Sequence, residues 1–374
     1  MQAMRVGWLA YGVDRRLSGI SRQALEVGRA LGKRQDCAVV YLTPFRHGPF
    51  RHESKARSFH LAGCGHLPAL MLVGGLTVAV AARRCNLDIV HDPSGIAPFP
   101  FGRRIAPFRR VVTIYDAIGF RYPEGYPWLN NVLQRRYLPA MLPHLDAVIT
   151  ASRHARADLQ HFLPGIPSPV HVVPPALGEQ FHSVSTEARR PVLARLGLHR
   201  PYVLTVSAQQ ERKNLRRLVR AFGKLHEQAP DYQLVLAGAP LWRYASLQQD
   251  IEQAGLSDHV VAPGYIADAD LPSLYSGASA FIFPSLVEGF GLPVLEAMAC
   301  ATPVVCSNTS SLPEAAGDAA LLVDPADTDA LANGMRRVLR DATLRQRLRQ
   351  RGLQRVRLFT PEGAADNTVQ VYRR

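Results

Sequence analysis

Residues 280–305, AFIFPSLVEGFGLPVLEAMACATPVV, join a strand-like run to a helix-like run through a turn that contains Gly289 and Gly291. The apolar run is typical of a buried parallel strand, and Pro293 suits the first position of the helix that follows. The two glycines permit unusual φ angles and a close approach of the backbone to a ligand. Because the helix start offers unpaired N–H groups and a partial positive charge, this turn is predicted to bind phosphate or sugar hydroxyls.

Two glutamates, Glu288 in the turn and Glu296 on the first turns of the helix, share this stretch. A carboxylate accepts hydrogen bonds through two oxygens, so Glu296 suits a ribose diol and Glu288 suits the hydroxyls of a transferred sugar. The alternative is that Glu296 only complements the helix dipole, worth about 0.3–1 kcal/mol, while Glu288 is solvated. The spacing alone leaves both interpretations open.

Short apolar runs alternate with helix-length amphipathic segments along the whole chain. This alternation is typical of parallel sheets that are covered on both faces. The two halves each contain a set of such runs and therefore predict two doubly wound α/β units. The predicted strands are 4–10, 36–42, 88–92, 109–116, 146–152 and 169–174 in the first half, and 202–208, 232–238, 259–266, 279–285, 302–308 and 319–325 in the second.

A chain of 374 residues exceeds one ordinary core, which favours two domains. The regular pattern fades at roughly 174–200, a segment rich in Pro, Gly and Ser that is predicted to be a linker. We therefore expect Rossmann-like domains at 1–180 and 200–358, with a last helix at 359–374 that packs back on the first domain. Parallel sheets bind ligands at the carboxyl ends of their strands, so the two domains should face one another across a ligand-binding cleft.

Composition limits the classes of partner. Hydrophobic residues make up 47% of the chain, as in a globular protein, and the net charge of +14 favours anionic partners. The five cysteines show no metal-binding spacing and indicate reduced thiols in the cytosol. The N-terminus is predicted to be a strand rather than a signal peptide. The uncharged run 67–82 is short for a membrane span, which needs about 20 residues, and a helix buried against a sheet is favoured over a membrane-facing patch.

The stretch around Glu288 and Glu296 resembles the E-x7-E signature of the retaining glycosyltransferase family 4, whose two Rossmann-like lobes form the GT-B architecture. The resemblance extends over nearly the whole chain and is that of bacterial enzymes of polysaccharide assembly. Its further segments are SGI at 18–20, VVTIYDAIGFRYPE at 111–124, DAVITASRHARADL at 146–159, VSAQQERKNLRRLVRAF at 206–222 and SNTSSLPEAAGDAALLVDP at 307–325.

The resemblance implies that Arg212 and Lys213 neutralise the diphosphate of a nucleotide-sugar donor as it becomes the leaving group. Charge stabilisation of this kind is usually the largest catalytic contribution. The two residues could instead be solvated, but positive charge at a helix start opposes the dipole and therefore favours ligand binding. The resemblance also assigns Glu288 to the transferred sugar and Glu296 to the ribose. The remaining donor-binding residues it implies are Gly19, Tyr265, Ile266, Gly289, Phe290, Gly291 and Leu292.

The sequence departs from the family pattern at three positions. Tyr115 replaces the usual His before Asp116, and Asp116 itself matches the motif and is expected to be a catalytic acceptor-side residue; a turn or helix cap is its alternative role. Ser207 replaces an arginine, which leaves the diphosphate to Arg212 and Lys213. Ala301 replaces a glycine, which we interpret as a packing change at a helix end. His91 ends a predicted strand, where a structural role is favoured over ligand contact.

The pair Asp268 and Asp270 has the D-x-D spacing by which some glycosyltransferases hold a metal ion. The pair precedes a helix, so capping is the simpler interpretation. We expect a metal-independent enzyme without a cofactor, because Arg212 and Lys213 already supply positive charge at the donor.

The resemblance implies retaining transfer of a hexose, with mannose favoured, to a saccharide or a polyprenyl-diphosphate-linked acceptor. It also makes GDP-mannose the favoured donor and a UDP-sugar the next. A sugar-nucleotide 2-epimerase on the same fold and a polyanion-binding protein are the alternatives, although no nucleic-acid motif accompanies the arginines. The enzyme is expected in the cytoplasm, where basic residues would draw it to the anionic inner face of the cytoplasmic membrane at about 1 kcal/mol each.

Overall fold

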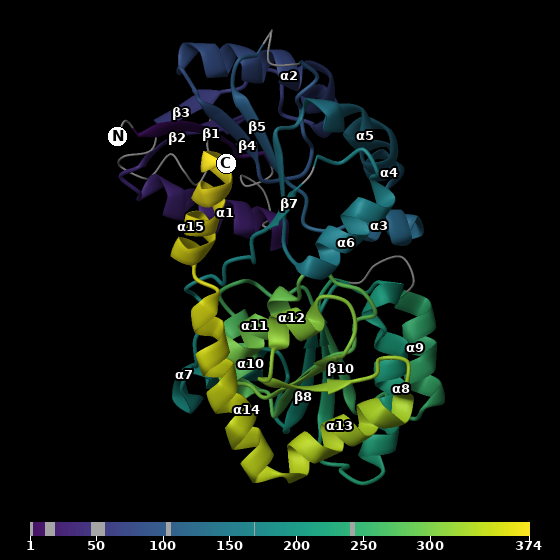
Figure 1. The fold of residues 1–374 in the computed structure, drawn as a ribbon. Coiled ribbons are helices and arrows are strands. Elements are labelled where there is room, and N and C mark those ends of the chain that lie inside the picture. The colour runs from purple at the N-terminus through teal and green to yellow at the C-terminus, as the bar shows by residue number, and fades with distance from the viewer. Residues whose placement is uncertain (1–2, 12–18, 46–56, 102–105, 168, 240–243) are drawn as a thin grey trace. The chain divides into compact units, whose positions relative to one another are not determined.

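The computed structural model describes residues 3–11, 19–45, 57–101, 106–167, 169–239 and 244–374 (Figure 1). The contacts within the chain divide it into two compact units. Unit 1 comprises Met1–Gly178 together with Phe359–Arg374, and unit 2 comprises Glu179–Leu358. Each unit is an α/β fold around one parallel sheet, so the predicted fold class is confirmed.

The sheet of unit 1 has seven parallel strands in the order β3-β2-β1-β4-β5-β6-β7. Two predicted runs form strands of only four residues, β4 and β6, and neighbouring strands on both sides bury all four residues of each. The edge strand β3 was not predicted, since its sequence RSFH is polar and mostly exposed. The strands are β1 (Met4–Leu9), β2 (Cys37–Thr43), β3 (Arg57–His60), β4 (Ile89–Asp92), β5 (Arg109–Thr113), β6 (Ala147–Thr150) and β7 (Val170–Val172).

Helices cover the sheet of unit 1, and two of them begin at side-chain caps. The Oγ of Ser152 accepts a hydrogen bond from the Ala155 N–H at 2.9 Å, and the Oγ1 of Thr360 accepts one from the Gly363 N–H at 3.0 Å. The helices are α1 (Gly19–Gly32), α2 (Leu67–Arg84), α3 (Ile118–Arg121), α4 (Trp128–Val132), α5 (Leu138–Met141), α6 (Arg153–Phe162) and α15 (Pro361–Arg373), with short turns η2 (Pro123–Gly125), η3 (Leu133–Tyr137) and η4 (Leu142–His144).

The last helix, α15, belongs to unit 1 and packs beside α1 (Figure 1). Its residues Ala364, Val369 and Tyr372 join a buried cluster that also contains Trp8 of β1 and Leu31 of α1. The end of the chain thus completes one face of the sheet that the beginning of the chain starts.

Helix α2 is the only helix in the described part of the chain that is long and apolar enough to cross a membrane, and 39% of that stretch is buried. Its predicted burial holds for one face. Leu70, Gly74 and Val78 are buried, whereas Leu72 is 83% exposed and Leu76 is 61% exposed.

The sheet of unit 2 has six parallel strands in the order β10-β9-β8-β11-β12-β13. The central pair is β8 beside β11, with Ala280 opposite Val203. Because the sheet is parallel, the segments that follow β8 and β11 leave it at the same edge. The strands are β8 (Tyr202–Val206), β9 (Gln233–Ala237), β10 (Val260–Gly264), β11 (Ala280–Phe283), β12 (Val304–Ser307) and β13 (Ala320–Val323).

The helices of unit 2 include one inside the predicted linker. The segment 174–200 contains α7, which starts after Ser185, whose Oγ accepts from the Ala188 N–H at 3.3 Å, and which contacts α10. Pro191 inside α7 hid it from the sequence pattern. The helices are α7 (Thr186–Arg195), η5 (Glu211–Lys213), α8 (Leu215–His226), α9 (Tyr244–Gln253), α10 (Leu271–Gly277), α11 (Leu292–Ala299), α12 (Leu312–Ala316), α13 (Thr328–Arg340), α14 (Ala342–Arg355) and η6 (Val356–Leu358).

Candidate active site

The carboxyl edge of the unit 2 sheet brings together the two sequence motifs of this half of the chain. The turn η5, which carries Arg212 and Lys213, follows β8, and the turn that carries Glu288 follows the adjacent strand β11. A backbone hydrogen bond of 2.7 Å from the Leu286 N–H to the Arg212 carbonyl joins the two turns. Residues about 75 positions apart in sequence therefore form one cluster.

Glu288 forms ion pairs with both basic residues. Its Oε1 lies 2.5 Å from the Nζ of Lys213, and its Oε2 lies 3.1 Å from the Nη1 of Arg212. The same guanidinium donates to the Val287 carbonyl at 3.0 Å and to the Gln210 Oε1 at 2.9 Å. The cluster contains two positive charges and one negative charge, so it retains an excess positive charge toward an anionic ligand.

The cluster is largely removed from water. The side chains of Lys213 and Glu288 are 9% and 10% exposed. Burial by itself would raise the pKa of the Glu288 carboxyl, but the charges of Lys213 and Arg212 outweigh it and hold that pKa below its ordinary value. The ammonium of Lys213 also lies 4.9 Å from the centre of the Phe283 ring, a favourable cation–π distance. Glu288 is therefore an ionised carboxylate in a buried site.

Three residues that the sequence analysis did not single out fix these turns. Asn214 adopts a left-handed conformation with φ 58° and donates from Nδ2 to the carbonyls of Pro284, at 3.1 Å, and Pro325, at 2.8 Å. The Oγ of Ser310 accepts from the Glu288 N–H and donates to the Glu288 carbonyl, both at 2.9 Å. The Oγ of Ser311 donates to the same carbonyl at 2.8 Å.

The glycine turn has the special backbone that the sequence predicted at Gly291. Its φ is 108°, and a Cβ there would lie 2.5 Å from the Cδ2 of Leu312. Gly289 and Phe290 are buried in the same turn, and Leu292 begins α11. A side chain at position 291 would thus be strained by its backbone conformation and would also require the end of the Leu312 side chain to shift.

Glu296 lies one turn into α11 and is 5% exposed. Its Oε2 accepts a hydrogen bond of 2.7 Å from the hydroxyl of Tyr275 in α10. Because Glu296 lies beyond the first N–H groups of the helix, it does not cap them. Sequence spacing could not reveal Tyr275, which lies 21 residues before it.

Tyr265 and Ile266, two of the predicted donor-binding residues, follow β10. Tyr265 is 59% exposed and Ile266 is 6% exposed, so the two differ sharply in access to solvent. The strand ends at Gly264, whose carbonyl accepts from the Gly238 N–H at 2.8 Å. Gly238 has φ 140°, and a Cβ there would lie 2.0 Å from the Ser207 carbonyl oxygen. The carboxyl edge of this sheet therefore requires glycine at position 238, which was not predicted from the sequence.

In unit 1, the predicted residues Gly19 and Asp116 occupy different settings. Gly19 begins α1, and a Cβ there would meet no atom of the more distant described residues within 4 Å, whereas Ser18 lies outside the described residues. Asp116 follows β5, and its Oδ1 accepts from the Ile118 N–H at 3.0 Å at the start of α3. Burial raises the pKa of the neighbouring Tyr115 hydroxyl, so Tyr115 stays neutral near pH 7.

His91 has the favoured structural role. It is 1% exposed, its Nδ1 lies 2.6 Å from the Tyr372 hydroxyl and its Nε2 lies 2.8 Å from the Thr113 Oγ1. Burial lowers its pKa to about 3, so the ring is neutral near pH 7. His91 links β4 to α15 within the core of unit 1.

The interpretation of Ala301 as a packing change is wrong. Ala301 has φ 56°, and its N–H donates to the Met298 carbonyl at 3.0 Å where α11 ends. The position requires a left-handed residue, which explains a glycine there, and alanine adopts that conformation at a cost of roughly 1–2 kcal/mol.

Asp270 of the D-x-D pair does not provide the predicted helix cap. Asp270 precedes α10 without a side-chain cap, and its Oδ2 lies 2.6 Å from the Nη2 of Arg195. Among the residues that the structure describes, no group of three or more His, Cys, Asp or Glu side chains could hold a metal ion.

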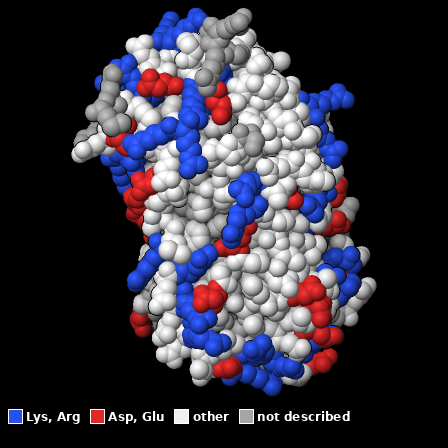
Figure 2. Space-filling view, in the orientation of Figure 1, with Lys and Arg blue, Asp and Glu red and all other residues white. Residues whose placement is uncertain are grey.

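Two arginines of the second half donate hydrogen bonds to helix ends within unit 2. Arg345 donates to the Val338 carbonyl at 3.1 Å at the end of α13, and Arg355 donates to the Ala315 carbonyl at 3.0 Å at the end of α12. In Figure 2, basic side chains lie among acidic ones on the face shown rather than in one continuous patch. The basic side chains of this face therefore do not form the continuous patch that a polyanion would require.

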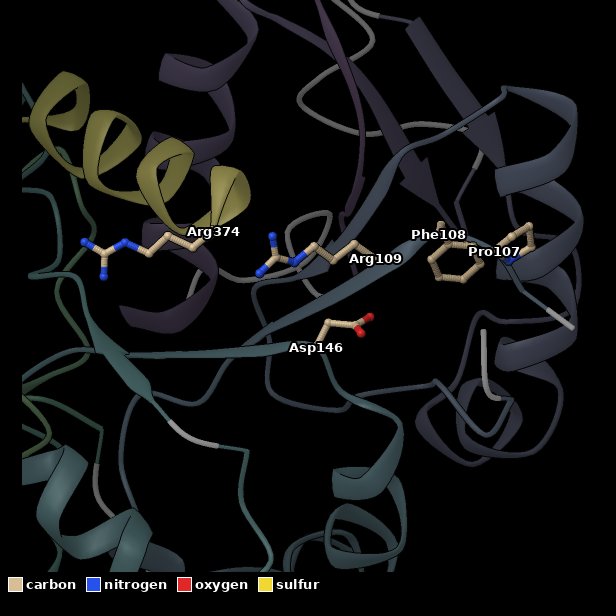
Figure 3. A pocket seen from close by; sticks show the side chains of 5 residues that line it. All are labelled: Pro107, Phe108, Arg109, Asp146 and Arg374. Atoms are coloured by element: carbon tan, nitrogen blue, oxygen red, sulfur yellow. The ribbon is translucent and has the colours of Figure 1, made fainter. Parts of the chain in front are cut away.

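A pocket in unit 1 lies at the amino edge of its sheet, where β5 begins and Asp146 precedes β6. Figure 3 shows the guanidinium groups of Arg109 and Arg374 extended in one direction, while the carboxylate of Asp146 points the other way. Arg109 donates to the Tyr372 carbonyl at 2.9 Å, and Asp146 accepts from the Arg110 N–H at 2.8 Å. These residues hold the sheet and α15 together.

Comparisons with known protein families match both halves of the chain. The model described as "Glycosyltransferase Family 4" matches residues 17–181, and the model described as "Glycosyl transferases group 1" matches residues 194–355.

Relatives are found among characterised mannosyltransferases. The O-antigen chain mannosyltransferase B of Escherichia coli is 33% identical over 287 residues, which cover 76% of this chain and 74% of the relative. The GDP-mannose-dependent alpha-(1-6)-phosphatidylinositol monomannoside mannosyltransferase of Mycolicibacterium smegmatis is 30% identical and covers 81% of each chain.

Solved structures share the fold. HepE from Anabaena, solved with UDP and glucose, superposes with a TM-score of 0.76 at 18% identity over 99% of both chains. Sucrose-phosphate synthase from Thermosynechococcus elongatus gives 0.75 at 23% identity over 100% of this chain and 98% of that one. The two sheets, the matched family models and the E. coli relative together establish that this chain is a GT-B enzyme of glycosyltransferase family 4.

Proposed function

We propose that this glycosyltransferase transfers mannose from GDP-mannose to an acceptor hydroxyl with retention of the anomeric configuration. The observation that carries the proposal is the cluster of Arg212, Lys213 and Glu288 at the carboxyl edge of the unit 2 sheet. Two cations and an ionised carboxylate at this edge suit a ligand that combines a diphosphate with sugar hydroxyls.

In the proposed reaction, the bond between the anomeric carbon and the donor diphosphate breaks, and the acceptor oxygen bonds to that carbon on the same face. The proton of the acceptor hydroxyl passes to the leaving diphosphate. Arg212 and Lys213 stabilise the negative charge that develops on the diphosphate. In this proposal the charge of Arg212 and Lys213 stabilises the leaving diphosphate without a metal ion or another cofactor.

We assign the other donor contacts by the resemblance of the sequence to family 4. Glu288 would accept from hydroxyls of the transferred sugar, and Glu296, already held by Tyr275, would accept from the ribose. The turn from Gly289 to Leu292 supplies backbone to the donor, and the backbone of Tyr265 and Ile266 lies beside the base. In unit 1, we assign Gly19 to the approach of the diphosphate and Asp116 to the acceptor.

The choice of mannose and GDP follows from the relatives. The names of the two mannosyltransferases described above specify mannose, and one specifies GDP-mannose. A UDP-sugar is the next candidate. We propose a saccharide or polyprenyl-diphosphate-linked acceptor of surface polysaccharide synthesis, used in the cytoplasm at the inner face of the cytoplasmic membrane, where the net charge of +14 favours anionic lipid.

A thermal-shift screen tests the donor. GDP-mannose should raise the melting temperature of the protein more than UDP-glucose or ADP-glucose does, and the rise should shrink in Lys213→Gln but not in the exposed control Lys224→Gln. The absence of a rise with all three donors would overturn the proposal. Conversion of GDP-mannose to another GDP-hexose without an acceptor would show the 2-epimerase instead.

A further inference from the structure

Helix α2 exposes an apolar face. Leu72, Val73, Leu76 and Val80 are 83%, 44%, 61% and 40% exposed. At 100° per residue these four side chains fall within one arc of about 100° on the helix. Contiguous exposed apolar surface of this kind is unfavourable in water and marks an interaction site.

The opposite face fixes α2 to unit 1. Leu70 and Val78 are fully buried in the core cluster of this unit. The backbone at Gly75 comes so close to Pro100 that a Cβ there would lie 2.3 Å from the proline Cδ. The helix therefore lies on unit 1 as a surface element, at the periphery of the unit in Figure 1, and cannot leave it to span a bilayer without losing this packing.

Charge identifies the occupant of the exposed face. The helix ends with Arg83 and Arg84, which are exposed and fall on the same side, within about 120° of Leu72. The sequence of α2 contains no acidic residue. A surface of leucine and valine that ends in two arginines matches an acyl region bordered by anionic head groups.

A second copy of the chain fits this face less well. A stable protein interface usually has roughly 20–30 residues on each side. Four apolar side chains are far fewer. In a symmetric dimer through this face, Arg83 and Arg84 would also find no carboxylate on the α2 helix of the second copy, because α2 contains none. The observations therefore favour lipid.

We propose that the face of α2 formed by Leu72, Val73, Leu76 and Val80 docks unit 1 on a membrane that contains anionic lipid, with Arg83 and Arg84 at the head groups. The helix lies parallel to the surface, buried on one side by protein and on the other by lipid. The inference rests on the proposed function in one respect: membrane docking would bring the enzyme to a lipid-linked acceptor. Membrane binding itself requires neither donor nor acceptor.

Vesicle flotation tests the docking surface without substrate. The intact protein is mixed with vesicles of phosphatidylcholine alone or with roughly one third phosphatidylglycerol. We expect flotation with the anionic vesicles, a loss of about tenfold or more in Leu72→Ser/Leu76→Ser, and a loss in Arg83→Ser/Arg84→Ser. The control Leu353→Ser/Leu358→Ser removes exposed leucines of unit 2, and Arg190→Ser/Arg347→Ser removes the same charge from exposed sites there.

The outcomes separate this inference from the proposed function. Failure to float with anionic vesicles, equal flotation with neutral vesicles, or equal losses in the control variants would overturn it. Light scattering that shows a wild-type dimer dissolved by Leu72→Ser/Leu76→Ser would also overturn it, because a second copy would then cover the face. The thermal shift with GDP-mannose should be the same in these variants, and its absence in the wild type would contradict only the proposed function.

Discussion

The Nζ of Lys213 lies 2.5 Å from the Oε1 of Glu288, although the two residues belong to turns after different strands. This contact pairs Glu288, the first glutamate of the E-x7-E motif, with Lys213, a cation that is proposed to bind diphosphate. The pKa of Glu288 is held low by this contact and by Arg212 despite burial. An anionic donor must therefore share these cations with Glu288 or displace it from them.

Glu288→Gln should lower kcat by about a hundredfold or more, the size expected when a charge-stabilising group is lost. Binding of free GDP should be unchanged or tighter, because the amide no longer competes with phosphate for Lys213 and Arg212. Steady-state kinetics and calorimetry with GDP measure the two effects. The exposed Glu227→Gln serves as control, and an unaltered kcat in Glu288→Gln would remove Glu288 from the site.

Lys213→Gln should weaken GDP binding by about 10–100-fold, the equivalent of a lost charge-assisted hydrogen bond of about 1.5–3 kcal/mol. The loss should be larger at low salt, because the interaction is electrostatic. Titration at two ionic strengths measures it. The control Lys224→Gln removes a half-exposed lysine that pairs with Asp329, and equal losses in both variants would exclude a specific role for Lys213.

Ser310→Gly should lower kcat while leaving KM for the donor nearly unchanged, because the Oγ of Ser310 holds both backbone groups of Glu288. Glycine tolerates the φ of 62° at this position, so the variant removes the hydroxyl without adding strain. Ser310→Ala should be less stable than Ser310→Gly by about 1 kcal/mol. Equal kcat in wild type and Ser310→Gly would show that the hydroxyl does not position Glu288.

Ala301→Gly should raise the free energy of unfolding by about 0.5–1 kcal/mol, because glycine relieves the left-handed strain but gains entropy in the unfolded chain. Denaturant titration measures the change. The matched control is Ala299→Gly inside α11, where φ is not positive and glycine should destabilise by about 1 kcal/mol. Destabilisation by both substitutions would contradict the explanation of position 301.

Protonation of His91 should destabilise the fold in acid. Its pKa is lowered from 6.5 to about 3 by burial, so the unfolded chain binds the proton more readily than the folded one. Its contribution to stability is complete above pH 6.5 and is lost as the pH falls from 6.5 toward 3, by about 1.4 kcal/mol per pH unit. Unfolding titrations should show a flatter pH dependence for His91→Gln than for the wild type or Tyr372→Phe. Parallel curves would exclude His91 as the source.

The sequence predicted both sheets because buried parallel strands require continuous apolar runs, which stand out from the segments around them. It missed β3, whose four residues are polar, and it placed a linker over α7, whose helix contains Pro191. In these segments the neighbouring elements decide the conformation, so local composition was a poor guide.

The candidate site was predictable where its residues lie close together in one short segment of the sequence. The glycine turn and Glu288 belong to such a segment, and so do Arg212 and Lys213. The hydrogen bonds of Ser310 to Glu288 and of Tyr275 to Glu296 were not predictable, because each joins residues more than 20 positions apart. Ser and Tyr are common at many surfaces, so neither position stood out before folding brought it to its glutamate.

The return of α15 to unit 1 reverses the order in which the two units can finish folding during synthesis. Unit 2 is one continuous segment, Glu179–Leu358, whereas unit 1 lacks Tyr372, the partner of His91, until α15 leaves the ribosome. The half that is translated first is therefore the last to be completed, and until then Trp8 and its apolar neighbours lack the cover of α15. A chain that stops before Phe359 should keep an intact second half beside a first half that chaperones and proteases can recognise.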